Sequence, residues 1–349
     1  MSANHFYRGR RAASIENAQV RVTVLQEGGH IAEIFDKRTG VNPLWTPVWP
    51  SIEPSTYDRA RHALYGDAVD ATLLAGIMGH NLCLDIFGAP SAAEAAAGMP
   101  AHGEASTAAF HLQVSTGSLM MQAHLLLANL RFERRITLED TAIRVHESVI
   151  NLGGTDRPIG WTEHVTLGPP FLKKGVTEFR ASATRSKVLD GVFGTADYLE
   201  SGAEFDWPHA PHKNGGSADL RVYTDAPASS AFTSHLMDPA ETHAFVTAFD
   251  PESRHCIGYI WRREDFPWLG IWEENCSRTQ PPWNGETLSR GLEFGVSPIA
   301  ESRRQMIDRG RLFDTPTFRW IPALSHVDVE YCILSGVADR IPESLQWPA

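Results

Sequence analysis

Cysteine is scarce in this chain of 349 residues, which contains only four. None of them forms a Cys-x-x-Cys pair, so the sequence excludes a zinc ribbon and a dithiol redox motif. The four positions, Cys83, Cys256, Cys276 and Cys332, are widely spaced. We expect buried, reduced thiols, which are typical of a reducing compartment, and therefore a cytoplasmic protein.

Long apolar runs and an excess of basic residues are also lacking. No run is long enough to cross a bilayer, and the basic segment 1–11 is not followed by the apolar stretch of a signal peptide. The 31 Lys and Arg are outnumbered by 42 Asp and Glu, which gives a formal net charge of −11. Nucleic acid and anionic membranes attract basic faces, so we expect neither as a partner.

Apolar residues that alternate with polar ones dominate what is present. Residues 20–24 read Val-Arg-Val-Thr-Val, Gly28-Gly29 makes a turn, and residues 30–35 return as a second strand. Similar runs, separated by Gly and Pro, continue through most of the chain. They predict an all-β sandwich of large antiparallel sheets. We assign residues 1–16 to an N-terminal arm and residues 17–349 to one domain.

Two segments are predicted to be helical. The first covers residues 54–76. The second is a short helix over residues 91–98, where Ser91 and Glu94 form a capping-box pattern and Gly98 can end the helix. With so few helices, we expect them to lie in connections between strands.

A histidine, a carboxylate and a tryptophan lie close together in the run Trp161-Thr162-Glu163-His164. The alternation there ends in a Gly-Pro-Pro turn, so His164 should lie near the end of a strand. Imidazole, carboxylate and an aromatic face together suit an acid/base site that handles a sugar. His102 and the acid pair Glu273-Glu274, beside Trp272, complete the candidate set. A structural role in the core or on the surface is the alternative for each.

Five segments, taken in order, resemble the galactose mutarotase (aldose 1-epimerase) superfamily, in its diverged bacterial branch. They are Glu27 to Ile34, His102-Gly103, Trp161 to Gly168, Gly270 to Glu273, and Gly295 to Pro298. The resemblance implies a β-supersandwich with a few short helices. It also implies an isomerase that interconverts the α and β anomers of an aldose or a sugar derivative, with no cofactor and no metal. The usual Asn-Arg-Ile motif is absent, which puts the identity of the sugar in doubt.

The resemblance implies catalytic roles for His164 and Glu273. His164 would protonate the ring oxygen. Glu273 would remove the anomeric proton, and burial beside Trp272 should raise its pKa toward neutrality. Glu274 is the fallback, because adjacent strand residues point to opposite faces. Further residues expected to bind the substrate are His102, His80, Asp85, Glu104, Glu163, Trp161, Trp272 and Arg290.

Other functions remain open from the sequence. The fold also suits a carbohydrate-binding protein without turnover. A hydrolase or lyase would need two carboxylates facing each other across a groove. A metal site formed by several of these histidines and acids is a further alternative, although no spacing demands it. The expected partner is a small-molecule carbohydrate, and a homodimer is left open.

Overall fold

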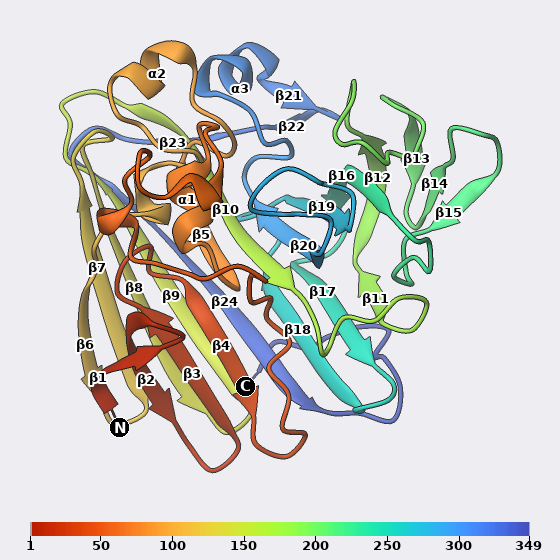
Figure 1. Cartoon of the computed structure of the whole chain (residues 1–349), viewed down its shortest axis with the longest axis horizontal. Coiled ribbons are helices and arrows are strands. Elements are labelled where there is room, and N and C mark those ends of the chain that lie inside the picture. Colours follow the sequence, from red (N-terminus) through yellow and green to blue (C-terminus); the bar gives the residue numbers. More distant parts are fainter. Residues whose placement is uncertain (1, 349) are drawn as a thin grey trace.

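Two antiparallel β-sheets pack face to face in the protein (Figure 1), a computed structural model that describes residues 2–348. In this part of the chain the larger sheet has twelve strands and the smaller has eight. The all-β prediction is confirmed. No helix within the described residues is both long and apolar enough to span a membrane.

The larger sheet contains the strands that carry the candidate site. Along the sheet the order is β1 (Ser2–Tyr7), β2 (Arg10–Glu16), β3 (Val20–Leu25), β4 (Ile31–Asp36), β5 (His80–Asp85), β10 (Arg157–Leu167), β20 (Leu288–Gly295), β19 (Trp268–Asn275), β16 (Ser229–Met237), β12 (Ala183–Val188) and β13 (Glu204–Asp206). A further strand, β23 (Arg319–Ile321), pairs with the start of β10.

The smaller sheet covers one face of the larger. Its order is β11 (Glu178–Ala181), β17 (His243–Asp250), β18 (His255–Arg262), β24 (His326–Val337), β9 (Ala142–Asn151), β8 (Leu130–Glu139), β7 (Ser118–Leu125) and β6 (His111–Ser115). Two small ribbons lie outside both sheets, formed by β14 (His209–Pro211) with β15 (Ser217–Asp219) and by β21 (Arg311–Leu312) with β22 (Thr315–Pro316).

The N-terminal segment departs from its prediction. Residues 2–16 form β1 and β2 of the larger sheet instead of a separate arm. Ala13 and Ile15 explain this, because both are buried in the main core and could not remain in solvent without cost. The predicted hairpin that follows is confirmed, since β3 and β4 pair antiparallel.

The helices are short. The prediction of a helix over residues 54–76 is wrong for most of its length, because only α1 (Ala71–Gly76) is α-helical there, preceded by two 3₁₀ turns. Gly66, with φ of 77°, ends the second of these turns. The short helix near residue 94 is confirmed as α2 (Ala92–Ala96), and both hydrogen bonds of its capping box are present. A helix that we did not predict, α3 (Arg303–Arg309), follows strand β20 in the chain.

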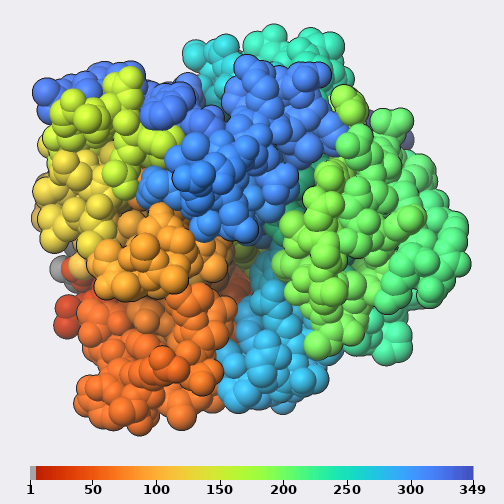
Figure 2. Space-filling view, turned by 90° about the horizontal axis from the view of Figure 1, so that it is seen from above, coloured from red at the N-terminus to blue at the C-terminus, as the bar shows by residue number. Residues whose placement is uncertain are grey.

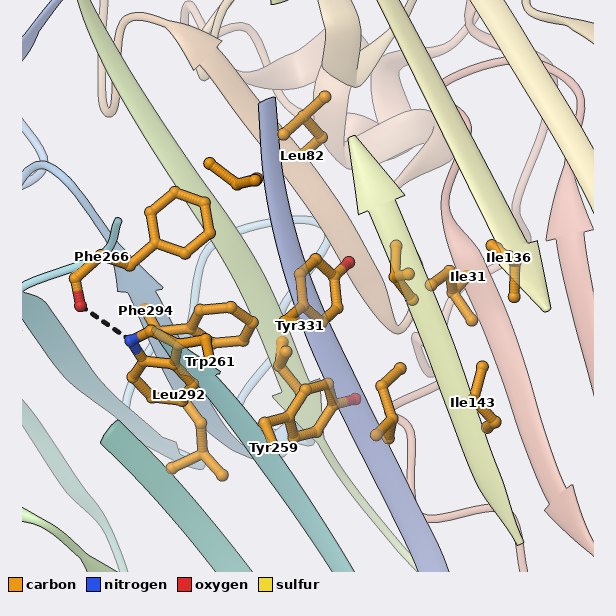
Figure 3. Close-up of a cluster of buried hydrophobic side chains, with 14 of the residues drawn as sticks. Ile31, Leu82, Ile136, Ile143, Tyr259, Trp261, Phe266, Leu292, Phe294 and Tyr331 are labelled. Carbon is orange, nitrogen blue, oxygen red and sulfur yellow. Dashed lines mark hydrogen bonds between the residues drawn. The ribbon is translucent and has the colours of Figure 1, made fainter. Parts of the chain in front are cut away.

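The main hydrophobic core fills the space between the two sheets (Figure 3). Trp261 of the smaller sheet stacks on Phe294 of the larger, with ring centroids 4.3 Å apart and an interplanar angle of 13°. Tyr331 meets the same phenylalanine edge-on at 5.3 Å. Each large side chain buried in this way contributes about 1.5–3 kcal/mol of apolar burial. The sheet that carries the site is therefore firmly backed on its inner face.

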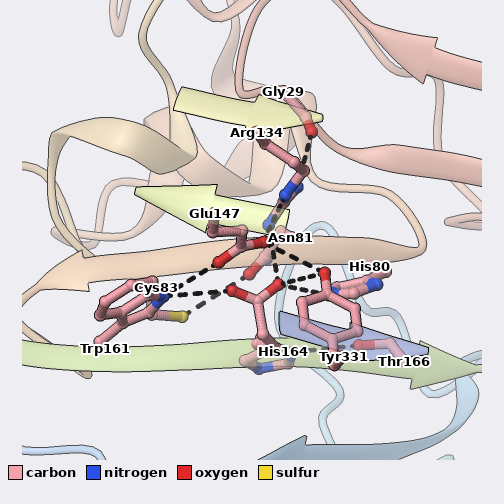
Figure 4. A network of polar contacts seen from close by, with 11 residues as sticks. Gly29, His80, Asn81, Cys83, Arg134, Glu147, Trp161, His164, Thr166 and Tyr331 are labelled. Carbon is pink, nitrogen blue, oxygen red and sulfur yellow. Dashed lines mark hydrogen bonds and ion pairs between the residues drawn. The ribbon is translucent and has the colours of Figure 1, made fainter. Parts of the chain in front are cut away.

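A buried polar network crosses the same interior (Figure 4). Arg134 on β8 donates to Glu147 on β9 at 2.6 Å and to Glu163 on β10 at 2.7 Å, so one guanidinium joins the two sheets. His80 Nε2 lies 2.7 Å from Glu163 Oε2, and the Tyr331 hydroxyl lies 3.1 Å from the same oxygen. All five side chains are buried.

The charges in this network nearly balance. Burial raises the pKa of Glu147 to about 8, and Arg134 opposes that shift only in part. Burial also lowers the pKa of His80 well below its usual value, so its imidazole is neutral. With Glu147 protonated, the carboxylate of Glu163 stands against the Arg134 guanidinium. The network is therefore an inter-sheet clamp whose buried charges are paired, as such charges must be.

Candidate functional site

A cavity of about 130 Å³ opens on the outer face of the larger sheet, the face turned away from the smaller sheet. Its floor is formed by side chains of β10, β16, β19 and β20, and its walls come from α1 and from loops near residues 102, 193 and 280. These segments are far apart in sequence, and Figure 2 shows the orange, green and blue parts of the chain meeting on one side of the molecule. This volume is slightly below the roughly 150 Å³ of an engineered cavity that binds benzene, so a sugar ring with its hydroxyl groups would fill it and extend into its open mouth.

His164 and Glu293 form a direct pair in the floor of the cavity. They are cross-strand neighbours, because β10 and β20 pair with His164 opposite Glu293. Nε2 of the imidazole lies 3.0 Å from Oε1 of the carboxyl group, and both side chains are buried. Gly291, two residues before the acid on the same strand face, leaves the space that the carboxyl group occupies, because an added Cβ would collide with Oε1.

Burial sets the protonation of this pair. It raises the pKa of the Glu293 carboxyl well above its usual value. It lowers the pKa of the His164 imidazole well below its usual value, and nearby His102 adds to that shift. Both shifts disfavour the charged forms, so at neutral pH the pair holds one proton between the carboxyl and the imidazole. An acid and a base that share one proton suit proton transfer in both directions.

His102 forms the side of the cavity next to His164, with ring centroids 5.2 Å apart. It lies in the loop after α2 and takes a φ of 65°, a left-handed conformation that is uncommon for a residue other than glycine. Gly103 follows, and a Cβ there would collide with the carbonyl oxygen of Leu84. Strained backbone held by tight packing is a frequent feature of functional sites.

Aromatic rings and one arginine line the rest of the cavity. The ring of Trp272 lies 5.9 Å from that of His164 and packs edge-on against Trp283 at 6.0 Å. Arg278 lies over Trp283, with Cζ 4.8 Å from the ring centroid, and its Nε is 3.4 Å from Glu274. Asp70, the N-cap residue of α1, also lines the cavity, and burial raises the pKa of its carboxyl group. Flat apolar faces with a few polar groups are what a pyranose ring requires.

Glu273, the predicted base, does not reach this cavity. Trp272 points into the cavity, so the next residue of the strand points to the inner face of the sheet. There its carboxyl group accepts a hydrogen bond from Ser229 at 2.5 Å and lies 3.6 Å from Arg290. The expectation that His164 and Glu273 share one cavity is thus corrected. The fallback, Glu274, accepts from Ser277 and Arg278 of its own loop and does not line the cavity either.

Because neighbouring strand residues face opposite ways, four other residues predicted to bind the substrate also lie away from the cavity. Glu163, next to His164, points inward and belongs to the inter-sheet clamp with His80 and Trp161. Arg290 also points inward, over the ring of Phe179 with Cζ 4.5 Å from its centroid. None of these four predicted residues lines the cavity.

The two remaining predicted contacts are occupied elsewhere. The carboxylate of Asp85 is bound by Arg157 at 2.7 Å and by Arg303 at 2.9 Å, which ties α3 to the sheet. Glu104 accepts from the backbone N–H of Ala128 at 2.7 Å. Of the ten residues predicted for the site, the structure therefore brings together His164, His102 and Trp272. Within residues 2–348, no group of three or more His, Cys, Asp and Glu is arranged to hold a metal ion.

The residue that the sequence reasoning missed is Glu293. A signal was present, because Glu293 lies between Leu292 and Phe294 in a strand, with glycines at positions 291 and 295. Alternation sends the two apolar residues into the core and the lone acid to the other face, beside residues too small to cover it. Residues far away in the chain, in α1 and the surrounding loops, decide which face of the sheet carries the cavity. A local sequence pattern does not reveal that face.

Comparison with solved structures supports the architecture. A candidate aldose 1-epimerase from Klebsiella pneumoniae superposes with a TM-score of 0.67 over 96% of this chain and 82% of its own, at 14% identity. A galactose mutarotase related enzyme from Lactobacillus acidophilus gives a TM-score of 0.59 over 95% and 99% of the two chains, at 13% identity. The chain has the galactose mutarotase-like fold. No family model and no curated protein sequence matches it.

The galactose mutarotase-like fold confirms the architecture implied by the resemblance. A third structure, a galactose mutarotase-like protein from Lactobacillus casei, gives a TM-score of 0.58 over 93% of this chain and all of its own, at 14% identity. Identities this low carry the fold and not the activity, because one fold supports many functions. Evidence of function in this chain therefore lies in the residues of its cavity.

Proposed function

We propose that this protein is a carbohydrate-active isomerase that interconverts the α and β anomers of an aldose or a sugar derivative. The observation that carries the proposal is the His164–Glu293 pair, which sits beside His102 in a cavity lined by Trp272 and Trp283. A group that must give a proton and a group that must take one lie next to each other there, and both have strongly shifted pKa values.

The reaction needs only proton transfers. The shared proton first moves from the Glu293 carboxyl group to His164 across their 3.0 Å contact. The resulting carboxylate takes the proton of the anomeric hydroxyl while the His164 imidazolium gives its proton to the ring oxygen, and the bond between C1 and that oxygen breaks. The open-chain aldehyde turns about the C1–C2 bond. The ring oxygen then attacks the other face of the carbonyl, its proton returns to His164, and Glu293 returns its proton to the anomeric oxygen. The pair carries one proton at every stage, so no cofactor enters the balance.

The rate of anomer exchange should therefore depend on pH in a bell shape. Below the lowered pKa of His164 the pair gains a second proton and Glu293 cannot act as a base. Above the raised pKa of Glu293 the pair loses its only proton and His164 cannot act as an acid. We expect the rate to fall on both sides of an interval around neutral pH. Saturation-transfer NMR across a pH series measures it, and a rate that rises without a maximum would contradict the shared proton.

The activity itself is tested by polarimetry on freshly dissolved α-sugars. A panel of aldoses and phosphorylated or oxidised derivatives should contain at least one whose mutarotation the protein accelerates above the rate in buffer. His164→Ala serves as the inactive comparison. If a sugar binds to the cavity but no member of the panel is accelerated, the protein is a binding protein. If a glycosidic bond is cleaved instead, the hydrolase alternative holds.

A further inference from the structure

A buried thiol contacts the second histidine of the cavity. Sγ of Cys83, on β5, lies 2.9 Å from Nδ1 of His102. The cysteine is fully buried and does not line the cavity, and its hydrogen bond to a cavity residue is the one to this imidazole. The other ring nitrogen, Nε2, has no hydrogen-bond partner among the described residues, and His102 itself lines the cavity. Each nitrogen of the ring thus has a different environment.

The protonation of both groups fixes the direction of this contact. Burial, reinforced by the carboxyl groups of Glu293 and Glu163, raises the pKa of the Cys83 thiol well above its usual value, so the sulfur keeps its proton. Burial lowers the pKa of His102 to about 4, so the ring is neutral and has one donor and one acceptor nitrogen. Among residues 2–348, the other hydrogen-bond acceptor within reach of the thiol is Oδ1 of Asn81, at 3.6 Å. The shorter contact makes Nδ1 the acceptor.

The backbone of His102 keeps the ring in place for this contact. Its N–H donates to Gly88 O at 2.8 Å and its carbonyl accepts from Leu84 N at 3.2 Å. The left-handed φ of 65° is thereby held through the peptide units before and after the residue. A ring with a fixed backbone and one occupied nitrogen has little freedom to turn or to change tautomer.

We infer that Cys83 is a positioning residue that holds His102 in the Nε2–H tautomer, so that His102 presents an N–H donor to an oxygen of the bound sugar. The tautomer part of this inference stands on the free protein, whereas the part that concerns the sugar rests on the proposed function. An N–H donor discriminates in favour of an oxygen that can only accept, such as the ring oxygen.

The tautomer is read directly by long-range ¹H–¹⁵N NMR of the free protein labelled with ¹⁵N-histidine. The His102 signals, assigned by their loss in His102→Gln, should show Nε2 protonated in the wild type and in Cys83→Ser, which keeps a donor. Cys83→Ala should show both tautomers. Cys332→Ala, which removes another buried thiol on β24 of the smaller sheet, outside the cavity lining, is the matched control and should leave the signals unchanged. Protonation at Nδ1 in the wild type, or an unchanged tautomer in Cys83→Ala, would overturn the inference.

The consequence for catalysis is tested separately with the sugar that the polarimetry identifies. Cys83→Ala should lower kcat/KM about 10-fold, the effect of one misplaced hydrogen bond, and Cys83→Ser should recover most of it. A changed tautomer with unchanged kcat/KM would overturn the role toward the sugar. A protein that accelerates no sugar would refute the proposed function, and the NMR result would still decide what Cys83 does.

Discussion

Glu293→Gln should slow anomer exchange by about 10³-fold while the protein stays folded. A positioned acid or base typically contributes about 10²–10⁴-fold, and glutamine keeps the size of the side chain but cannot take a proton. The amide can still donate to His164, whose Nε2 lies 3.0 Å from the carboxyl group in the native protein. Sugar binding should therefore persist, so kcat should fall far more than KM rises. Saturation-transfer NMR gives the exchange rate, and titration calorimetry gives the binding.

Glu273→Gln is the matched control for this prediction. It makes the same chemical change on the next strand, β19, but on the inner face of the sheet, where the carboxyl group bonds to Ser229. The variant should retain kcat within about 3-fold, even if its stability falls by the value of one buried hydrogen bond, about 1–3 kcal/mol. The opposite pattern, an inactive Glu273→Gln and an active Glu293→Gln, would show that the base was assigned to the wrong strand.

Arg134→Met should be the most destabilising single substitution in the inter-sheet clamp. It leaves the carboxylate of Glu163 buried without its cation and removes a hydrogen-bond donor from Glu147, and breaking a buried pair by removing one partner typically costs about 3–5 kcal/mol. Methionine fills most of the same space, so little of the loss would come from a cavity. Urea unfolding followed by tryptophan fluorescence measures the change.

Arg144→Met provides the comparison. Arg144 also joins two carboxylates, those of Glu139 at 3.1 Å and Glu330 at 3.2 Å, but these are partly exposed to solvent. Pairs of this kind contribute about 0.2–1 kcal/mol. Replacing Glu147 and Glu163 by glutamine in the Arg134→Met background should restore part of the stability, because no unpaired charge is then buried. Equal losses for the two arginine variants would mean that the clamp contributes nothing beyond a surface pair.

The sequence predicted the elements of this fold better than it predicted their environment. Alternation in residues 20–35 identified β3 and β4, and the Ser91–Glu94 pattern identified α2, because both signals act over a few residues. The segment 54–76 failed since its conformation is set by packing on the outer face of the sheet, where Tyr65 and Leu74 are buried in one cluster with Trp45 and Trp49. The helix propensity of residues 54–76 does not show how the segment packs against the sheet.

In the candidate site, too, the residues within local motifs were predicted, and those that depend on tertiary packing were not. His164 and His102 were identified from local runs, and the structure places both in the cavity. The base was assigned to Glu273, because the run Gly270 to Glu273 resembles the strand that ends in the superfamily's catalytic glutamate. Alternation alone rules that out once Trp272 is known to face the cavity, since neighbouring strand residues face opposite ways. Knowing which face carries the cavity requires the positions of α1 and of the loop around Trp283, which no local pattern encodes.

The strand β10 gives one side to the clamp and the other to the cavity, since Glu163 points inward and His164 outward. Deleting or inserting a single residue upstream in this strand would move each side chain to the opposite face of the sheet. A carboxylate would then lie in the cavity in place of the imidazole, and an imidazole would lie against Arg134. Relatives of this chain should therefore vary freely in the length of their surface loops, while the distance along β10 from its first paired residue to His164 stays constant.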